Sequence, residues 1–205
     1  MTAAGGSVSQ WGEEQRQAAR KGVWRWLLAA LGLSAAARRA DARAAACDAG
    51  AVGEQRTAAL LQPLEAAGWT VLHDLAIPGT RANADHVLVS PGGNVFLVDS
   101  KMRSAKWPVY GKDDQLWHGR VAMDRDMRSI RHETEMISRA LDVVVQPVIA
   151  VHNAVVAGGG FVVQSVPVVP ADRLVEVLRG NDGPPDAAAA WLAERAAQTL
   201  PPYLG

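Results

Sequence analysis

The stretch Asn83–Lys101, NADHVLVSPGGNVFLVDSK, predicts a β-hairpin. Residues 86–90 and 95–101 are mostly apolar and rich in β-branched side chains, which favour extended backbone. Pro91–Asn94 lies between them and combines proline, glycine and asparagine, the residues that form tight turns. The stretch therefore predicts two antiparallel strands joined by a short loop.

The register of this hairpin follows from the place of its loop. If the loop begins after Val89 and ends before Val95, these two residues pair, and antiparallel pairing then places Asp85 opposite Asp99. A shift of one residue would leave the two aspartates diagonal to each other, still within reach of a shared ion. Because side chains alternate along a strand, Asp99 and Lys101 face the same side. The hairpin thus gathers two carboxylates and one ammonium at its open end.

These three side chains suggest a metal site. Two close carboxylates repel each other unless they are protonated or share a cation, and oxygen ligands favour magnesium or manganese. Such an ion polarises a phosphate or lowers the pKa of a bound water, while Lys101 would orient the nucleophile or offset the developing charge. The alternative is an ordinary strand end with a solvated ion pair, the commoner origin of an isolated Asp-x-Lys. The second aspartate at the matching place on the partner strand favours the metal site.

Four segments of the chain form a set of motifs. They are N-x-D-H at Asn83–His86, D-S-K at Asp99–Lys101, G-x-x-G-E at Gly50–Glu54, and an apolar strand at Trp69–Pro78. Together they resemble the nuclease-related domain (NERD) family, a branch of the PD-(D/E)xK nuclease superfamily. The resemblance covers residues 50–141.

The resemblance implies a divalent-metal-dependent nuclease that hydrolyses phosphodiester bonds, in DNA more than in RNA, with Mg²⁺ or Mn²⁺ as cofactor. Asp85 and Asp99 would hold the metal, and the Ser100 carbonyl would complete the coordination. Lys101 would position the attacking water or stabilise the developing charge. Glu54 would be an outer or third ligand; read without the resemblance, it is a helix N-terminal charge favoured by the dipole.

The resemblance also implies a restriction-endonuclease-like core of order αβββαβ. The order of apolar segments independently predicts an α/β fold with a mixed central sheet flanked by helices. The expected helices cover residues 48–67, 125–141, 171–178 and 186–200, and the expected strands cover residues 69–77, 86–90, 95–101, 107–110, 115–121, 143–151 and 161–169. We expect Asp48 to cap the first helix and Trp191 and Leu192 to anchor the last one. The strands at 107–110 and 115–121 are expected to extend the edge of the sheet.

The charges are unevenly distributed along a chain whose net charge is zero. Residues 101–131 hold eight Lys/Arg and four Asp, whereas residues 49–100 hold two Arg and five acidic residues. An acidic metal site beside a basic strip is what a phosphodiester enzyme needs. The predicted nucleic-acid contacts are Arg103, Lys106, Arg128 and Arg131. For any one of these residues a solvated charged face is an equally good reading.

Three aromatic residues lie among the basic residues that follow the hairpin. Trp107, Tyr110 and Trp117 are interleaved with lysine and arginine, a pattern that can stack on unpaired nucleotides. At this spacing aromatic rings more often face the core of a hairpin. We expect the core-facing position for at least two of the three.

The helix at residues 125–141 departs from the family pattern. NERD relatives carry Asn-Pro-x-x-Gln at the start of this helix, whereas this chain has Asp126–Ile130, D-M-R-S-I, so His132 is the candidate substitute for the glutamine. The departure motivates an alternative function. The chain would then be a catalytically weak or inactive nucleic-acid-binding or scaffolding module with the same fold.

The first residues form an extension of different composition. We divide the chain into an Ala/Arg/Trp-rich helical extension, residues 1–47, and a NERD-like nuclease domain, residues 48–205. Residues 11–47 are expected to contact a partner protein or a second copy, with attachment of Trp24–Leu33 to a membrane surface as a weaker option. The apolar run is too short to cross a bilayer, so we expect no integral membrane segment and a cytoplasmic protein. Cys47 is the only cysteine, which excludes a disulfide framework.

Overall fold

The computed structural model describes residues 35–204, with side chains described from Gly50 onward. The chain separates into two compact units, Met1–Asp48 and Ala49–Gly205. The predicted contacts of residues 11–34 lie outside the described residues, and for residues 35–47 only the helical backbone is described. The proposed domain boundary and the role of the extension stay predictions. None of the described helices is both long and apolar enough to cross a membrane.

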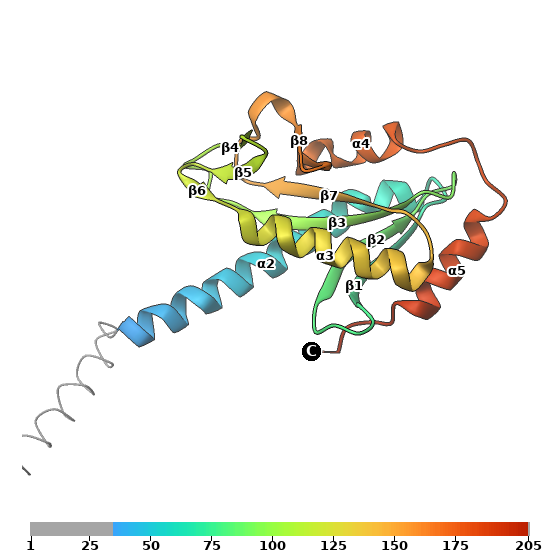
Figure 1. Cartoon of the computed structure of the whole chain (residues 1–205), viewed down its shortest axis with the longest axis horizontal. Helices are drawn as coiled ribbons and strands as arrows, with labels where there is room; N and C mark the ends of the chain where they lie inside the picture. Colours follow the sequence, from blue (N-terminus) through green and yellow to red (C-terminus); the bar gives the residue numbers. More distant parts are fainter. Residues whose placement is uncertain (1–34, 205) are drawn as a thin grey trace, which may run out of the picture. The chain divides into compact units, whose positions relative to one another are not determined.

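A six-stranded mixed sheet is the centre of the second unit (Figure 1). Its strand order is β1-β2-β3-β7-β9-β8. β1, β2 and β3 are antiparallel neighbours, β7 runs parallel to β3, β9 runs parallel to β7, and β8 is antiparallel to β9. The strands are β1 (Thr70–Ala76), β2 (Asn83–Val89), β3 (Val95–Met102), β7 (Val145–His152), β8 (Phe161–Val163) and β9 (Val166–Pro170). The predicted α/β fold with a mixed central sheet is confirmed.

The β2–β3 hairpin has the predicted register. Val89 pairs with Val95 and His86 pairs with Val98. The loop is closed by a backbone hydrogen bond from Ser90 N to Asn94 O at 2.9 Å, and Gly93 supplies the positive φ of +77° that the turn requires. The residues of the turn and the alternation of apolar side chains therefore favour the same strand register.

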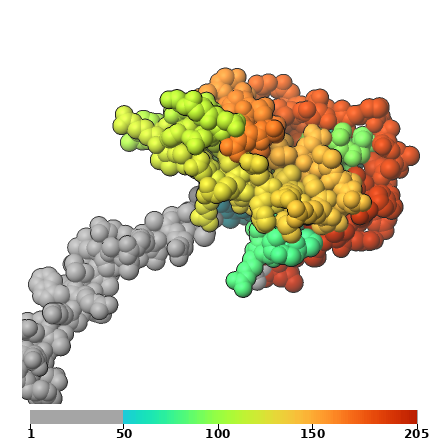
Figure 2. All heavy atoms as spheres, viewed as in Figure 1, coloured from blue at the N-terminus to red at the C-terminus, as the bar shows by residue number. Residues whose placement is uncertain are grey.

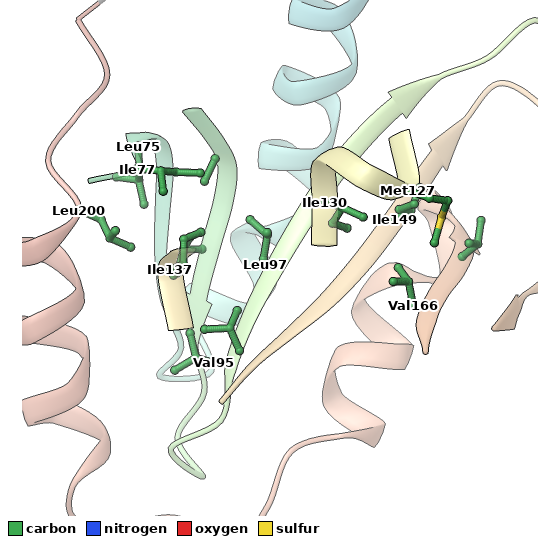
Figure 3. Close-up of a cluster of buried hydrophobic side chains, with 14 of the residues drawn as sticks. Leu75, Ile77, Val95, Leu97, Met127, Ile130, Ile137, Ile149, Val166 and Leu200 are labelled. Atoms are coloured by element: carbon green, nitrogen blue, oxygen red, sulfur yellow. The ribbon is translucent and has the colours of Figure 1, made fainter. Parts of the chain in front are cut away.

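Helices cover both faces of the sheet. α3 (Asp124–Leu141) and α5 (Ala189–Thr199) pack on one face over Val95, Leu97 and Ile149 (Figure 3). The opposite face is covered by the C-terminal part of α2 (Ala35–Glu65), the 3-10 helix η2 (Ala171–Arg173) and α4 (Leu174–Gly180). The buried side chains of α2 are Leu61 and Leu64, and those of α3 are Met127, Ile130, Ile137 and Leu141.

The first core helix begins earlier than predicted. α2 starts at Ala35, so Asp48 lies inside the helix and does not cap it. The reason is composition: residues 35–49 are mostly alanine and arginine, which have high helix propensity, and contain neither proline nor glycine. Pro63 lies near the other end, and the helix stops two residues later at Glu65.

The strands after the hairpin form a separate sheet, so their expected place at the edge of the main sheet is wrong. β4 (Val109–Lys112), β5 (Gln115–His118) and β6 (Val121–Ala122) make a three-stranded antiparallel sheet of their own. β3 already has β2 and β7 as neighbours, so the chain that leaves it meets no free edge. A two-residue turn at Asp113 and Asp114, both with positive φ, joins β4 to β5.

Two further expectations are corrected at the C-terminal end. The single strand expected at residues 161–169 is the hairpin β8–β9, because Gln164 and Ser165 adopt positive φ and reverse the chain; the 3-10 helix η1 (Ala157–Gly159) precedes it. Trp191 is 58% exposed and does not anchor α5. Leu192 is buried as predicted, and Ala196 is buried with it, because an i, i+4 pair defines the face of the helix that packs on the core.

Candidate active site

Asp85 and Asp99 come together at the open end of the β2–β3 hairpin. Asp85 Oδ2 accepts a hydrogen bond from the backbone N–H of Ser100 at 2.8 Å, which fixes this carboxylate against β3. Asp99 shares its face of β3 with Leu97, on the side that α3 covers, and is only 5% exposed. The hairpin thus holds two carboxylates at one place, Asp99 buried and Asp85 partly buried.

The two oxygens of Asp99 have different surroundings. Oδ1 accepts a hydrogen bond from Lys101 Nζ at 2.6 Å. Oδ2 is buried and has no hydrogen-bond partner within the described part of the chain. A buried carboxylate oxygen without a partner is costly, so this atom is suited to a ligand that brings positive charge.

The carboxyl groups have altered proton affinities. Burial raises the pKa of Asp99, and the charge of Asp85 raises it further against the opposing charge of Lys101. Burial also raises the pKa of Asp85, against the opposing hydrogen bond from Ser100 N–H. Burial lowers the pKa of Lys101, but the charge of Asp99 and its hydrogen bond raise it, and the net result is a raised pKa. The pair therefore favours a shared proton or a bound cation, and Lys101 stays protonated at neutral pH.

The donor set fits a hard divalent cation. Among the described residues, no group of three or more His, Cys, Asp and Glu side chains is placed to hold a metal ion. The side-chain donors at this end of the hairpin are the two aspartates. Magnesium keeps several waters and commonly binds through one or two carboxylates, so this oxygen set suits it or manganese.

Glu54 reaches the same region from α2. An added Cβ on Gly53 would lie 2.9 Å from Met102 Cγ, so α2 approaches the end of β3 closely at this glycine. Burial raises the pKa of Glu54, as do the charges of Asp74 and Asp99, while Lys101 lowers it. Glu54 therefore lies within the electrostatic field of the aspartate pair, on the sheet side of its helix.

The four predicted nucleic-acid contacts fall into two groups. Arg103 and Lys106 lie on the connection after β3, where Arg103 forms an ion pair with Asp126 and Lys106 is exposed. Arg128 and Arg131 lie on the exposed side of α3, and Arg131 Nη1 donates to Gln164 Oε1 at 3.1 Å. Three of the four are thus accessible, while Arg103 is held by a carboxylate of the protein.

Comparison with known families gives one match. The family model described as "Nuclease-related domain", NERD, matches residues 49–157, more than half of the chain. The chain belongs to the NERD family. It is thereby a nuclease-related protein of the PD-(D/E)xK-like superfamily, whose domains typically use divalent metals. No curated protein and no solved structure matches the chain.

In this NERD domain, three acidic residues to which the sequence analysis gave no role lie near the carboxylates of the site. Glu133 on α3 has a pKa raised by burial and by the charge of Asp99, and Ser129 Oγ donates to it at 2.7 Å. The charge of Asp126 raises the pKa of Asp99, and that of Asp74 raises the pKa of Glu54. A signal existed for Glu133, because it is spaced between Ile130 and Ile137 on the inward face of an amphipathic helix.

Glu133 lies closer to the aspartate pair than the residue proposed above to replace the family's glutamine at the start of α3. His132 was the candidate substitute for the family glutamine, but it is exposed on the outer side of the helix. Glu133 is partly buried and within the electrostatic field of both Asp99 and Lys101. The polar group that α3 directs towards the aspartate pair is therefore the carboxylate of Glu133, one position after His132.

A chain of hydrogen bonds, which begins at the exposed His73 and is buried from His86 onward, runs behind the site of this NERD domain. His73 Nδ1 and His86 Nδ1 are 2.7 Å apart, His86 Nε2 and Ser100 Oγ are 3.2 Å apart, and Ser100 Oγ donates to Thr57 Oγ1 at 2.8 Å. Thr57 Oγ1 then lies 2.7 Å from His152 Nε2. Burial lowers the pKa of His86 to about 3, so its ring is neutral. The chain joins β1, β2, β3, β7 and α2, and holds Ser100 at a defined position beside Asp85.

Proposed function

We propose that this NERD domain is a divalent-metal-dependent nuclease that hydrolyses phosphodiester bonds, in DNA more than in RNA. The observation that carries the proposal is Oδ2 of Asp99, which is buried and has no hydrogen-bond partner among the described residues. It belongs to a carboxylate that lies beside a second one, Asp85, and whose other oxygen accepts a hydrogen bond from Lys101. An unpaired buried carboxylate lowers the stability of the fold. Such groups are therefore found mainly at functional sites, where binding or catalysis requires them.

Each residue has a defined role in this proposal. Asp85 and Asp99 would hold Mg²⁺ or Mn²⁺, the Ser100 carbonyl would complete the inner set, and Glu54 would act from outside through water. When bound there, the cation supplies Lewis-acid polarisation of the phosphate and lowers the pKa of the attacking water. Lys101 presents a protonated ammonium to the developing charge, and its raised pKa argues against its acting as a general base.

The basic residues would bind the nucleic acid around this centre. Lys106, Arg128 and Arg131 are exposed and would contact phosphates, which gives affinity without sequence preference. Arg103 would act through its ion pair with Asp126, which ties the end of β3 to the start of α3. A cytoplasmic location and a partner contact through residues 11–47 stay predictions from the sequence.

The first test is cleavage of linear duplex, supercoiled and single-stranded DNA and of RNA, with magnesium, manganese or chelator. We expect cleavage only with metal, and a loss of about 100-fold in the Lys101→Met variant, since one charge-stabilising group is removed. Arg139→Met, which removes an exposed cation on the outer side of α3, serves as the control. Metal-independent cleavage, or full activity of Lys101→Met, would contradict the proposal.

Metal binding is testable without activity. Because the pKa of both Asp85 and Asp99 is raised, protons compete with the cation until the pH exceeds these raised values. We therefore expect magnesium or manganese to raise the melting temperature by on the order of 5 °C at pH 8 and by much less at pH 5.5. Differential scanning calorimetry measures both shifts. The Asp85→Asn variant should lose the shift at pH 8; an equal shift at both pH values would show binding elsewhere.

A second candidate function is a nucleic-acid-binding or scaffolding module without turnover. The observation in its favour is that Asp126, within the stretch that departs from the family, is engaged in an ion pair with Arg103, which gives this stretch a structural role at the start of α3. Calorimetric titration with manganese separates the two functions. Folded protein that binds nucleic acid but no metal, and cleaves nothing, would favour the second.

A further inference from the structure

An exposed tryptophan lies on the connection that leaves the candidate active site. Trp107, between β3 and β4, is 47% exposed. The two other aromatic residues of this region are held by the small sheet: Tyr110 Oη donates to Gly119 O at 2.8 Å, and Trp117 is partly buried. Tyr110 and Trp117 are thus partly buried, whereas Trp107 is the exposed ring of the three.

The backbone around Trp107 is fixed although its ring is exposed. Trp107 N–H donates to Ser104 O at 3.4 Å, and His118 Nε2 lies 3.1 Å from the same carbonyl. Gly119 has a φ of +60°, and an added Cβ there would lie 2.9 Å from Trp107 Cγ, so the indole rests directly on this glycine. Gly119 N–H in turn donates to Pro108 O at 2.9 Å. The ring is thus preorganised, so that binding of a ligand to it costs the protein little additional conformational entropy.

A cation accompanies the ring. Lys106 Nζ lies 5.4 Å from the centroid of the Trp107 ring, and both side chains are exposed. An aromatic face combined with an ammonium matches the two parts of a nucleotide, because the base stacks on the ring and the phosphate pairs with the cation.

The connection is anchored beside the candidate active site. Trp107 follows Lys101 by six positions, so the extended backbone between them spans at most about 20 Å. Arg103 N–H donates to His152 O at 3.1 Å and Val109 N–H to Val155 O at 2.8 Å, so both ends are attached to the end of β7 and the segment after it. Figure 1 shows the small sheet at the end towards which β7 points, and in Figure 2 its atoms protrude from the domain there.

We propose that Trp107 and Lys106 form a stacking site for an unpaired base, so that the nucleic acid bound by this protein is single-stranded or locally unpaired beside the site of cleavage. The inference rests on the proposed nuclease function and names its substrate class. A base within a duplex has no free face for the indole.

The test is binding of a fluorescent 12-nucleotide probe by the full chain, with the probe as single-stranded DNA, as RNA of the same sequence, and as duplex DNA. All proteins carry Asp99→Asn, and magnesium is present, so that the probe stays intact. We expect Trp107→Leu to weaken binding of the single strands between about 5-fold and about 100-fold, Trp107→Phe to retain most of the affinity, and duplex binding to change less than twofold. The ratio of the losses for DNA and RNA identifies the preferred strand.

The chain offers a matched control and a second variant. Trp191 is also exposed and has Arg195 5.2 Å from its ring, but it lies on α5, so Trp191→Leu should bind like the parent. Lys106→Gln should lower the slope of log affinity against log salt by about 0.7, the value for one phosphate contact on a single strand. If Trp107→Leu binds single strands within twofold of the parent, or loses duplex affinity equally, the inference is wrong.

The outcomes for this inference and for the nuclease function are separable. If the protein with Asp99 intact cleaves with metal but Trp107→Leu has no effect on binding, the stacking site fails and the nuclease stands. If it cleaves nothing but single-strand binding depends on Trp107, the nuclease fails and the stacking site stands.

Discussion

Replacement of Asp99 by Asn is expected to reduce metal-dependent cleavage by about 1,000-fold or more, because the cation contributes several kcal/mol to the transition state. The same change is expected to leave the free energy of unfolding of the metal-free protein unchanged or higher. Burial raises the pKa of Asp99, so its ionised form destabilises the fold, and this destabilisation grows as the pH rises from the usual pKa of an aspartate up to the raised pKa. The neutral amide removes that cost, and Lys101, 23% exposed, retains access to water.

The measurement combines a cleavage assay with urea unfolding at pH 5.5 and pH 8. The gain in unfolding free energy should be larger at pH 8, where Asp99 would otherwise be charged. Asp142→Asn is the matched control, since Asp142 is an exposed carboxylate in a left-handed conformation that asparagine also tolerates. A variant that unfolds at lower urea concentration and also loses cleavage would show that Asp99 is structural.

Replacement of Phe96 by Ala is expected to lower the free energy of unfolding by about 3–5 kcal/mol. Phe96 is 2% exposed, and its ring centroid lies 5.6 Å from that of Trp69 in the core between the sheet and α2. Truncation leaves a cavity on a strand bonded on both edges, where the backbone has little freedom to collapse.

Urea unfolding of the metal-free protein measures this effect. Val162→Ala on the outermost strand is the control, since Val162 is 65% exposed and its truncation should change the unfolding free energy by less than about 0.5 kcal/mol. A loss below 1 kcal/mol for Phe96→Ala would mean that this core repacks. Because Asp99 follows on the same strand, residual cleavage should fall in parallel with the folded fraction.

The site as a whole carries more negative charge than the two aspartates alone. Glu54 and Glu133 approach from the helices on the two faces of the sheet, and both have a pKa raised by burial and by Asp99. A bound cation would lower the pKa of both together. The metal-free protein is therefore expected to bind nucleic acid less tightly than the metal-loaded protein, in addition to lacking cleavage.

The sequence by itself determined the hairpin, its register and the meeting of Asp85 with Asp99. These features depend on short-range rules: alternation of side chains along a strand, and a turn with glycine at the position of positive φ. The mixed α/β fold and the NERD family also followed from local motifs and their order. The inward position of Glu133 follows from helical spacing as well, because Glu133 lies three positions after the buried Ile130.

Only the tertiary structure decided which side chains from distant segments lie beside the aspartate pair and the residues around it. The pairing of Arg103 with Asp126, the nearness of Glu54 and Glu133 to Asp99, and the separate small sheet depend on how helices pack on the sheet and on which strand edges are free. The exposure of Trp107 likewise depends on a glycine beneath its ring, twelve positions later in the chain. Local propensities carry no information about such contacts, because their free energies arise only when the elements are packed together.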